Sequence, residues 1–138
     1  MTAPRAREHL EDRHSVWLLQ WARYTRIQGE DIMPVSHIAD YLLHIPNGGK
    51  RAGREAARFK ALGVKAGISD YFLPLARAGY HGLWIELKRP KIKGNYPSIT
   101  DKQQAWIQRM HLARYDAMVA YGWQEAANRI TGYLGLPA

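Results

Sequence analysis

Two carboxylates and a lysine gather in residues 67–88, which read GISDYFLPLARAGYHGLWIELK. Asp70 stands before the first of two apolar runs, whereas Glu86 and Lys88 lie at the end of the second run. A carboxylate embedded in an apolar run is costly unless another charge compensates it. A divalent cation held by Asp70 and Glu86 beside an anionic substrate would compensate it. We therefore predict a site for Mg²⁺ (or Mn²⁺), which binds one or two carboxylates together with water and phosphate.

This set of residues suits phosphodiester hydrolysis, which needs a charge-stabilised phosphate, an activated water and aligned oxygens. Asp70 and Glu86 would supply metal ligands, and the carbonyl of Leu87 could add another. Lys88 would orient water or stabilise the charged transition state. The alternative for Glu86 and Lys88 is a simple exposed salt bridge. Other chemistries lack support, because the six histidines are scattered without metal-binding spacing and cysteine is absent.

The two apolar runs, residues 71–75 and 83–87, are joined by a glycine-containing turn, which is typical of a β-hairpin. Side chains alternate across a strand, so Glu86 and Lys88 share one face and Leu87 points to the other. The hairpin would therefore present its charged groups together.

Hydrophobic periodicity predicts a single α/β domain over residues 1–138, with the approximate order αβαββαβα. Gly, Pro and polar residues mark the loops at 29–40 and 89–99. The expected helices are 6–28, 51–62, one capped by Ser98 or Thr100 that runs to about 112, and 123–134; the other strands are 41–45 and 115–120.

Two polar residues fall near the buried edges of these helices. Glu11 shares a stripe with Leu18 on the first helix, although a solvated acid favoured by the helix dipole is an alternative. Gln103 shares a face with Trp106 and Ile107, where its amide needs a partner. Large aromatic residues are expected in the core, with contacts in a dimer as the alternative: Trp17, Trp21, Tyr80 and Trp84.

The formal net charge of +8 is concentrated in two clusters. Such clusters indicate a polyanionic partner, most simply nucleic acid, although a merely solvated basic surface is the alternative. No apolar run approaches the ~20 residues of a membrane span, and the N-terminus lacks the apolar centre of a secretory signal. We expect a cytoplasmic protein without membrane association. The cations expected to bind DNA are Lys50, Arg51, Arg54, Lys65, Arg89, Lys91 and Lys93.

Several segments in order resemble the VRR-NUC domain, a branch of the PD-(D/E)XK nuclease superfamily. They are IPNGGKR, KALGVKAGISDYFLP, GLWIELK and the closing YGWQEA segment, and the likeness covers about residues 42–134. The resemblance implies a restriction-endonuclease-like α/β core, in which a mixed central sheet is flanked by helices. It also resembles the small standalone versions found in phages and bacteria, which implies a bacterial or phage-infected host cell.

The resemblance assigns roles to individual residues. Asp70 and Glu86 match the acids of the motif, Lys88 matches its lysine, and Gln103 matches the glutamine that opens the following helix. In the first helix Glu11 matches the metal-site glutamate, with Glu8 as the alternative if the register differs. The family proline before the motif aspartate is Ser69 here, Ser15 replaces an expected glutamine, and the insert around 91–97 is longer than in compact members.

The resemblance implies a divalent-metal-dependent endonuclease that acts on branched DNA such as four-way (Holliday) junctions, as a homodimer. A two-fold enzyme suits a junction that offers two equivalent cleavage points. The alternatives are a nuclease directed at flaps or 5′ ends, a non-catalytic nucleic-acid-binding domain that retains the fold, and a restriction-type enzyme. The last would need elements that reach base edges in the groove of a duplex.

Overall fold

Strand β5 (Leu83–Lys88) occupies the interior of a four-stranded sheet with the order β3-β4-β5-β6. The computed structural model describes the backbone of residues 3–46 and 53–137, with side chains from residue 9. Strand β5 pairs antiparallel with β4 (Tyr71–Leu73) and parallel with β6 (Asp116–Tyr121), while β3 (Leu43–His44) pairs antiparallel with β4 at the edge. The predicted mixed sheet and its central hairpin are confirmed.

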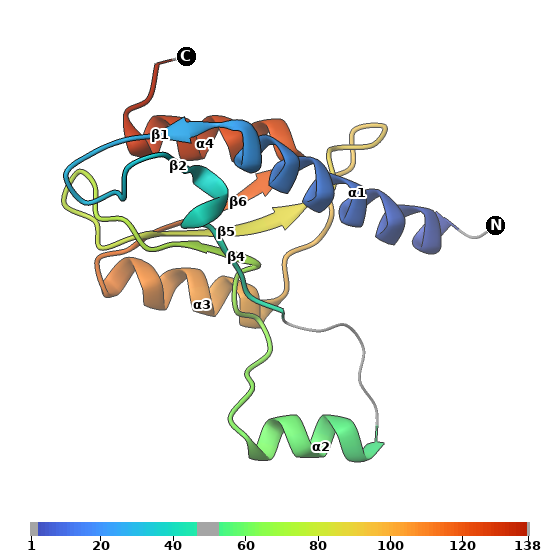
Figure 1. The fold of residues 1–138 in the computed structure, drawn as a ribbon. Coiled ribbons are helices and arrows are strands. Elements are labelled where there is room, and N and C mark those ends of the chain that lie inside the picture. Colours follow the sequence, from blue (N-terminus) through green and yellow to red (C-terminus); the bar gives the residue numbers. More distant parts are fainter. Residues whose placement is uncertain (1–2, 47–52, 138) are drawn as a thin grey trace.

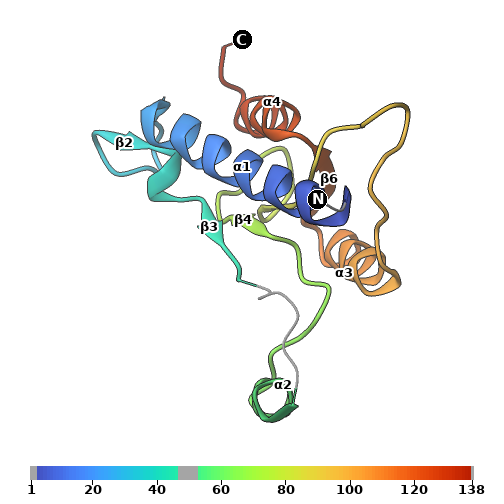
Figure 2. The same ribbon diagram turned by 90° about the vertical axis from the view of Figure 1, so that its right-hand side faces the viewer.

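Helices cover both faces of this sheet, as Figures 1 and 2 show. Helices α1 (Ala3–Tyr24) and α4 (Trp123–Leu134) lie together on one face, and α3 (Asp101–Leu112) lies on the other. Helix α3 connects the parallel strands β5 and β6, because such a pair needs a crossover rather than a tight turn. Helix α2 (Gly53–Ala61) projects away from these layers.

The core forms between the sheet and the α1/α4 layer. Leu83, Ile85 and Leu87 alternate along β5 and are at most 1% exposed. Leu18 of α1 and Ile130 of α4 are fully buried in the same cluster. The apolar side chains that recur every 3.6 residues on the helices therefore pack against those that recur every second residue on the strand, in one apolar layer. The other face of β5 carries Trp84, Glu86 and Lys88.

The hairpin loop ends in a tight turn at its tip. Arg77 and Tyr80 exchange backbone hydrogen bonds of 3.1 and 2.8 Å. Between them Ala78 has φ +51° and Gly79 has φ +86°. Positive φ at both central residues is what a type I′ turn requires, and its twist matches that of the strands.

The segment after α1 departs from the sequence prediction. Helix α1 ends at Tyr24 rather than at residue 28, and β1 (Arg26–Ile27) pairs with β2 (Ser36–His37) in a separate two-stranded sheet. A short 3₁₀ helix, Ile38–Asp40, follows it. The predicted loop at 29–40 is thus wrong over residues 36–40, because strands of two residues give no periodic signal.

A close backbone approach joins the segment after α2 to the body of the domain. Gly67 has φ +86°, and a Cβ there would lie 2.6 Å from the backbone carbon of Lys102 in α3. A side chain cannot be placed at this contact, so glycine is required. Gly67 precedes Asp70 by three residues, and its contact with α3 therefore sets where the chain enters β4.

None of the helices in residues 3–46 and 53–137 is both long and apolar enough to cross a membrane.

Candidate active site

The hairpin brings the two motif carboxylates together. Tyr71 of β4 is paired with Ile85 of β5. Extending this antiparallel register by one residue places Asp70 opposite Glu86, on the same face of the sheet. The Leu87 backbone N–H donates a hydrogen bond of 2.8 Å to Asp70 Oδ2, which fixes the Asp70 carboxylate directly before the start of β4.

Glu86 is the more buried of the two acids, with 2% of its surface exposed. Its Oε1 atom is buried and has no hydrogen-bond partner among the described residues. The pKa of Glu86 is raised to about 10. Burial is the largest cause, and the adjacent Asp70 adds to it through a hydrogen bond and its negative charge, against a smaller opposing effect of Lys88. Without a cation, this carboxyl is therefore held in its protonated form at neutral pH.

Glu11 and Lys88 complete the charged group. Burial raises the pKa of Glu11, and the nearby Lys88 ammonium partly offsets this while the Asp70 carboxylate adds to it. Glu11 also contributes to the raised pKa of Glu86. Helix α1 thus brings Glu11 within electrostatic reach of the strand residues, as the sequence predicted for its buried edge.

The face that carries Glu86 is covered by α3. Trp84, two residues earlier, packs edge to face on Trp106 of α3 with ring centroids 5.2 Å apart. Gln103 lies in the first turn of the same helix, where its Oε1 accepts a hydrogen bond of 2.9 Å from the Thr100 backbone N–H. Thr100 Oγ1 in turn accepts from the Gln103 backbone N–H, so the polar partner of Gln103 is the helix cap itself.

Asp70 and Glu86 fit a hard divalent cation. Both provide carboxylate oxygens, one of these is buried without a partner, and the pair carries an uncompensated charge when both groups ionise. Among the described residues, no three His, Cys, Asp or Glu side chains lie close enough together to hold a metal ion. The fit therefore rests on the two carboxylates, and water and substrate oxygens would complete the coordination shell of the cation. Direct ligation of the cation by Glu11 or by the Leu87 carbonyl oxygen stays a prediction.

Comparison with known proteins agrees with this geometry. No family model matches the chain, and no curated protein matches it. A solved structure described as a VRR_NUC domain protein superposes with a TM-score of 0.73 and 31% sequence identity, over 92% of this chain and 89% of its own. The chain belongs to the VRR-NUC family. The predicted restriction-endonuclease-like fold is confirmed, and it is the fold of a nuclease-type domain.

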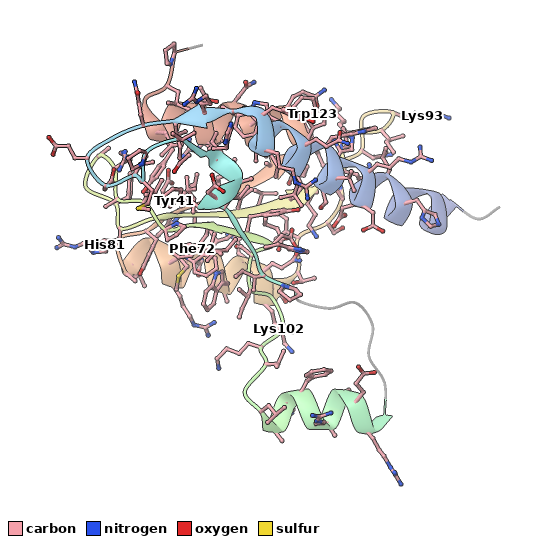
Figure 3. The ribbon with its side chains drawn as sticks, viewed as in Figure 1. Tyr41, Phe72, His81, Lys93, Lys102 and Trp123 are labelled. Carbon is pink, nitrogen blue, oxygen red and sulfur yellow. The ribbon has the colours of Figure 1, made fainter. Side chains whose placement is uncertain are left out.

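The basic residues predicted to bind DNA in this VRR-NUC domain are spread over different parts of the molecule. Lys91 and Lys93 are exposed on the loop after β5, and Figure 3 shows Lys93 pointing outward. Arg54 on α2 and Lys65 after it are also exposed. Arg89 is 5% exposed and donates a hydrogen bond of 3.0 Å to the Pro90 carbonyl oxygen. This bond and another to the Asn95 carbonyl oxygen hold the Arg89 guanidinium against its own loop, and a contact of Arg89 with DNA stays a prediction.

Three predicted residues cannot be placed, because Lys50 and Arg51 and the side chain of Glu8 lie outside the described residues. Ser69, which replaces the proline usual in VRR-NUC motifs, is 1% exposed. It thus occupies a buried position directly before Asp70.

The predicted loop after β5 contains a hydrogen-bonded turn of its own. Ile92 and Asn95 exchange backbone hydrogen bonds of 3.0 and 2.8 Å around Lys93 and Gly94, which both have positive φ. The ring of Tyr96 packs edge to face on Tyr121 of β6 at 4.7 Å. These contacts fix the exposed Lys93 at a turn tip.

Two aromatic residues expected in the core lie partly at the surface. Trp17 is 40% exposed and Tyr80 is 41% exposed. Trp84 instead stacks on Phe72 with centroids 4.3 Å apart, and Trp21 packs against the core cluster. The core prediction therefore holds for Trp21 and is wrong for Trp17 and Tyr80, whereas Trp84 is half-buried against α3 and lies outside the core cluster.

Sequence reasoning missed two cations on α3. Lys102 and Arg109 are exposed and line one side of a groove. Their spacing of seven residues puts them on the same face of a helix, together with Ala105 and Trp106. This i, i+3, i+4, i+7 pattern was the available signal.

Proposed function

We propose that this VRR-NUC protein is a divalent-metal-dependent endonuclease that hydrolyses phosphodiester bonds in DNA. The observation that carries the proposal is the placement of Asp70 opposite the buried Glu86, whose Oε1 has no partner among the described residues. A structural salt bridge would satisfy these groups, whereas a metal site leaves ligand atoms available until the cation binds.

The chain's own residues would divide the work. Asp70 and Glu86 would hold Mg²⁺ or Mn²⁺, which when bound supplies charge neutralisation on the phosphate and lowers the pKa of a bound water. Lys88, on the same face of β5, would orient that water or stabilise the negative charge that develops on the phosphate. Glu11 would add negative charge on the α1 side, and Gln103 would shape the site from the start of α3.

Branched DNA, with the four-way junction as the first choice, is the proposed substrate. The support is the likeness to standalone VRR-NUC domains and the physical match between a two-fold homodimer and a junction with two equivalent strands. The net charge of +8 supplies attraction to the phosphate backbone but does not select a DNA structure.

The test is a cleavage assay on end-labelled four-way junction, flap, duplex and single-stranded DNA, with Mg²⁺, Mn²⁺ or EDTA. We expect metal-dependent paired cuts at symmetric positions of the junction. Cuts in the flap alone would support metal-dependent phosphodiester hydrolysis but would refute the four-way junction as the substrate. Binding without cleavage under every metal condition would overturn the proposed activity.

A further inference from the structure

The segment 90–96, here called the arm, follows β5 directly and folds back on itself. Ile92 and Asn95 bond each other through their backbones, and the two residues between them, Lys93 and Gly94, have φ +48° and +83°. A lysine with positive φ is uncommon, and such a conformation persists only where the surrounding contacts hold it. The arm is therefore built to keep a lysine at the tip of a tight turn.

Arg89 closes the arm at its base. Its Nη1 atom donates one hydrogen bond of 3.0 Å to the Pro90 carbonyl oxygen and another of 3.4 Å to the Asn95 carbonyl oxygen. Arg89 is 5% exposed, and among residues 9–46 and 53–137 no carboxylate lies within ion-pair distance of its guanidinium. The bonds of this buried cation thus join the two ends of the turn to each other.

A second contact fixes the arm to the sheet. Tyr96 packs edge to face on Tyr121 of β6, with ring centroids 4.7 Å apart. The Nζ atom of Lys91 lies 5.5 Å from the centroid of the Tyr96 ring, within the range of a cation–π contact. Arg89 and Tyr96 therefore hold both ends of the arm, which leaves its tip to project.

The tip lies within reach of a substrate bound at the carboxylate pair. Lys93 is exposed, and Figure 3 shows its side chain pointing away from the body of the domain. Lys93 follows Lys88 by five residues, so their Cα atoms are at most about 18 Å apart. Duplex DNA carries one phosphate per ~1.7 Å of its axis, so several phosphates beside a bound one lie within this distance.

We propose that Arg89 is a positioning residue, which holds the arm so that Lys93 contacts a backbone phosphate of the DNA beside the cleavage point. The inference rests on the proposed function in that this phosphate belongs to the DNA substrate. The contact itself needs neither metal nor cleavage. A direct contact between Arg89 and a phosphate is the competing prediction, and the salt dependence of binding separates the two.

The test measures fluorescence anisotropy of a labelled duplex with the full chain in EDTA, over a series of salt concentrations. Lys93→Gln should lower the log–log salt slope by about 0.9, the value for one phosphate contact on a duplex. Arg89→Met, which keeps an apolar stem, should lower it by the same amount. The double variant should lose no more than either single variant, because a released arm no longer holds residue 93 at the phosphate. Arg23→Gln, which removes an exposed charge from α1, is the control and should keep the wild-type slope.

A second variant opens the turn without changing any charge. Gly94→Pro is incompatible with φ +83°, because proline fixes φ near −65°. It should lower the slope by about 0.9 although the net charge is unchanged. Gly79→Pro is the matched control, since Gly79 has φ +86° in a similar turn at the tip of the β4–β5 loop, and neither glycine has an atom within 4 Å of an added Cβ. It should bind like the wild type.

A further loss of slope in the double variant would overturn the positioning role and assign Arg89 to a phosphate of its own. An unchanged slope for Lys93→Gln or for Gly94→Pro would overturn the arm as a DNA contact. Because binding is measured in EDTA, a protein with the expected slopes and no cleavage would refute only the proposed nuclease. A protein that cleaves DNA with unchanged slopes would refute only the arm.

Discussion

At the scale of single residues, the two carboxylates of the site differ in how the fold supports them. Asp70 accepts a backbone hydrogen bond from Leu87, whereas Glu86 lies almost wholly buried with one oxygen unpartnered among the described residues. Burying this carboxyl with an unpartnered oxygen therefore lowers the stability of the folded protein when no cation is bound. Such a cost is common where a site is organised for a ligand. Lys88 on the same face offsets only part of this cost.

Glu86→Gln should change how the stability of the metal-free protein depends on pH. The pKa of Glu86 is about 10 in the folded chain against 4.5 for an ordinary glutamate, so between these values the native state binds more protons than the unfolded state. Stability must then fall as pH rises through this window. Urea denaturation in EDTA at roughly pH 5 and roughly pH 9 should show this fall in the wild type and a smaller fall in Glu86→Gln.

The control for this experiment is Glu125→Gln, since Glu125 is an exposed carboxylate in the first turn of α4. It should keep the pH dependence of the wild type. A Glu86→Gln profile parallel to that of the wild type would contradict the raised pKa of Glu86.

At the scale of elements, the site depends on contacts that hold α1 and the α2–β4 segment to the sheet. His14, one turn after Glu11, accepts a hydrogen bond of 2.9 Å at Nδ1 from the Trp123 backbone N–H at the start of α4. Gly67, three residues before Asp70 in the sequence, lies in close contact with the backbone of Lys102 in α3. The bond between His14 and Trp123 positions the helix that carries Glu11, and the contact between Gly67 and α3 positions the chain where it enters β4.

Gly67→Ala should disturb the site more than Gly63→Ala does. Both glycines have positive φ, +86° and +88°, so either substitution costs roughly 1–2 kcal/mol of backbone strain. At Gly67 the added Cβ would also meet the Lys102 backbone at 2.6 Å, whereas nothing lies within 4 Å at Gly63. We expect a larger fall in melting temperature for Gly67→Ala than for Gly63→Ala, and slower cleavage for Gly67→Ala only; equal effects of the two variants would refute the close contact.

His14→Ala should lower the free energy of unfolding by about 1–3 kcal/mol, because the Trp123 N–H loses its buried acceptor. Burial lowers the pKa of His14 below the ordinary histidine pKa of 6.5, so the unfolded chain binds this proton more readily than the folded one. The stabilisation that neutral His14 provides is therefore lost as the pH falls below that value. Urea denaturation of His14→Ala and of the exposed neighbour Arg13→Ala measures this. If both variants unfold like the wild type, His14 does not anchor α1 to α4.

At the scale of the whole molecule, the sequence predicted the parts with strong periodicity and missed the others. The hairpin and α4, predicted at 123–134 and observed as Trp123–Leu134, follow from clear apolar patterns. The β1/β2 pair and the end of α1 were missed, because Thr25 caps the helix by donating a 2.7 Å hydrogen bond to the Trp21 carbonyl oxygen, a local contact without a pattern. The close contact between Gly67 and the Lys102 backbone was also missed, because no residue spacing reveals it.

The candidate site was predictable to a similar extent. The pairing of Asp70 with Glu86 follows from strand register, and Lys88 follows from alternation. The bond from the Leu87 amide to Asp70 and the role of Gln103 in the helix cap were not predictable, because both depend on how the ends of β4 and α3 are placed in space. Sequence therefore indicates which groups meet, and the fold decides which atoms they use.

A homodimer that acts on a junction should behave in a defined way when subunits are mixed. Wild type and Glu86→Gln combined in equal amounts should form mixed dimers that cut one strand of the junction, because only one site of the pair holds its metal ligands. Gel analysis of a supercoiled plasmid with a cruciform distinguishes the nicked product from the linear one. A mixture that yields only linear product, in proportion to the wild type added, would contradict paired action by two subunits.

The central claim is that the carboxylates of Asp70 and Glu86 form the metal-dependent centre that cleaves DNA. The most direct measurement is the single-turnover cleavage rate of a labelled junction in Mg²⁺ for wild type, Asp70→Asn and the matched control Glu125→Gln, with DNA affinity measured in parallel. We predict that Asp70→Asn slows cleavage at least about a hundredfold and changes affinity less than about twofold, since the basic surface is unaltered. Cleavage by Asp70→Asn at the rate of Glu125→Gln would contradict the claim.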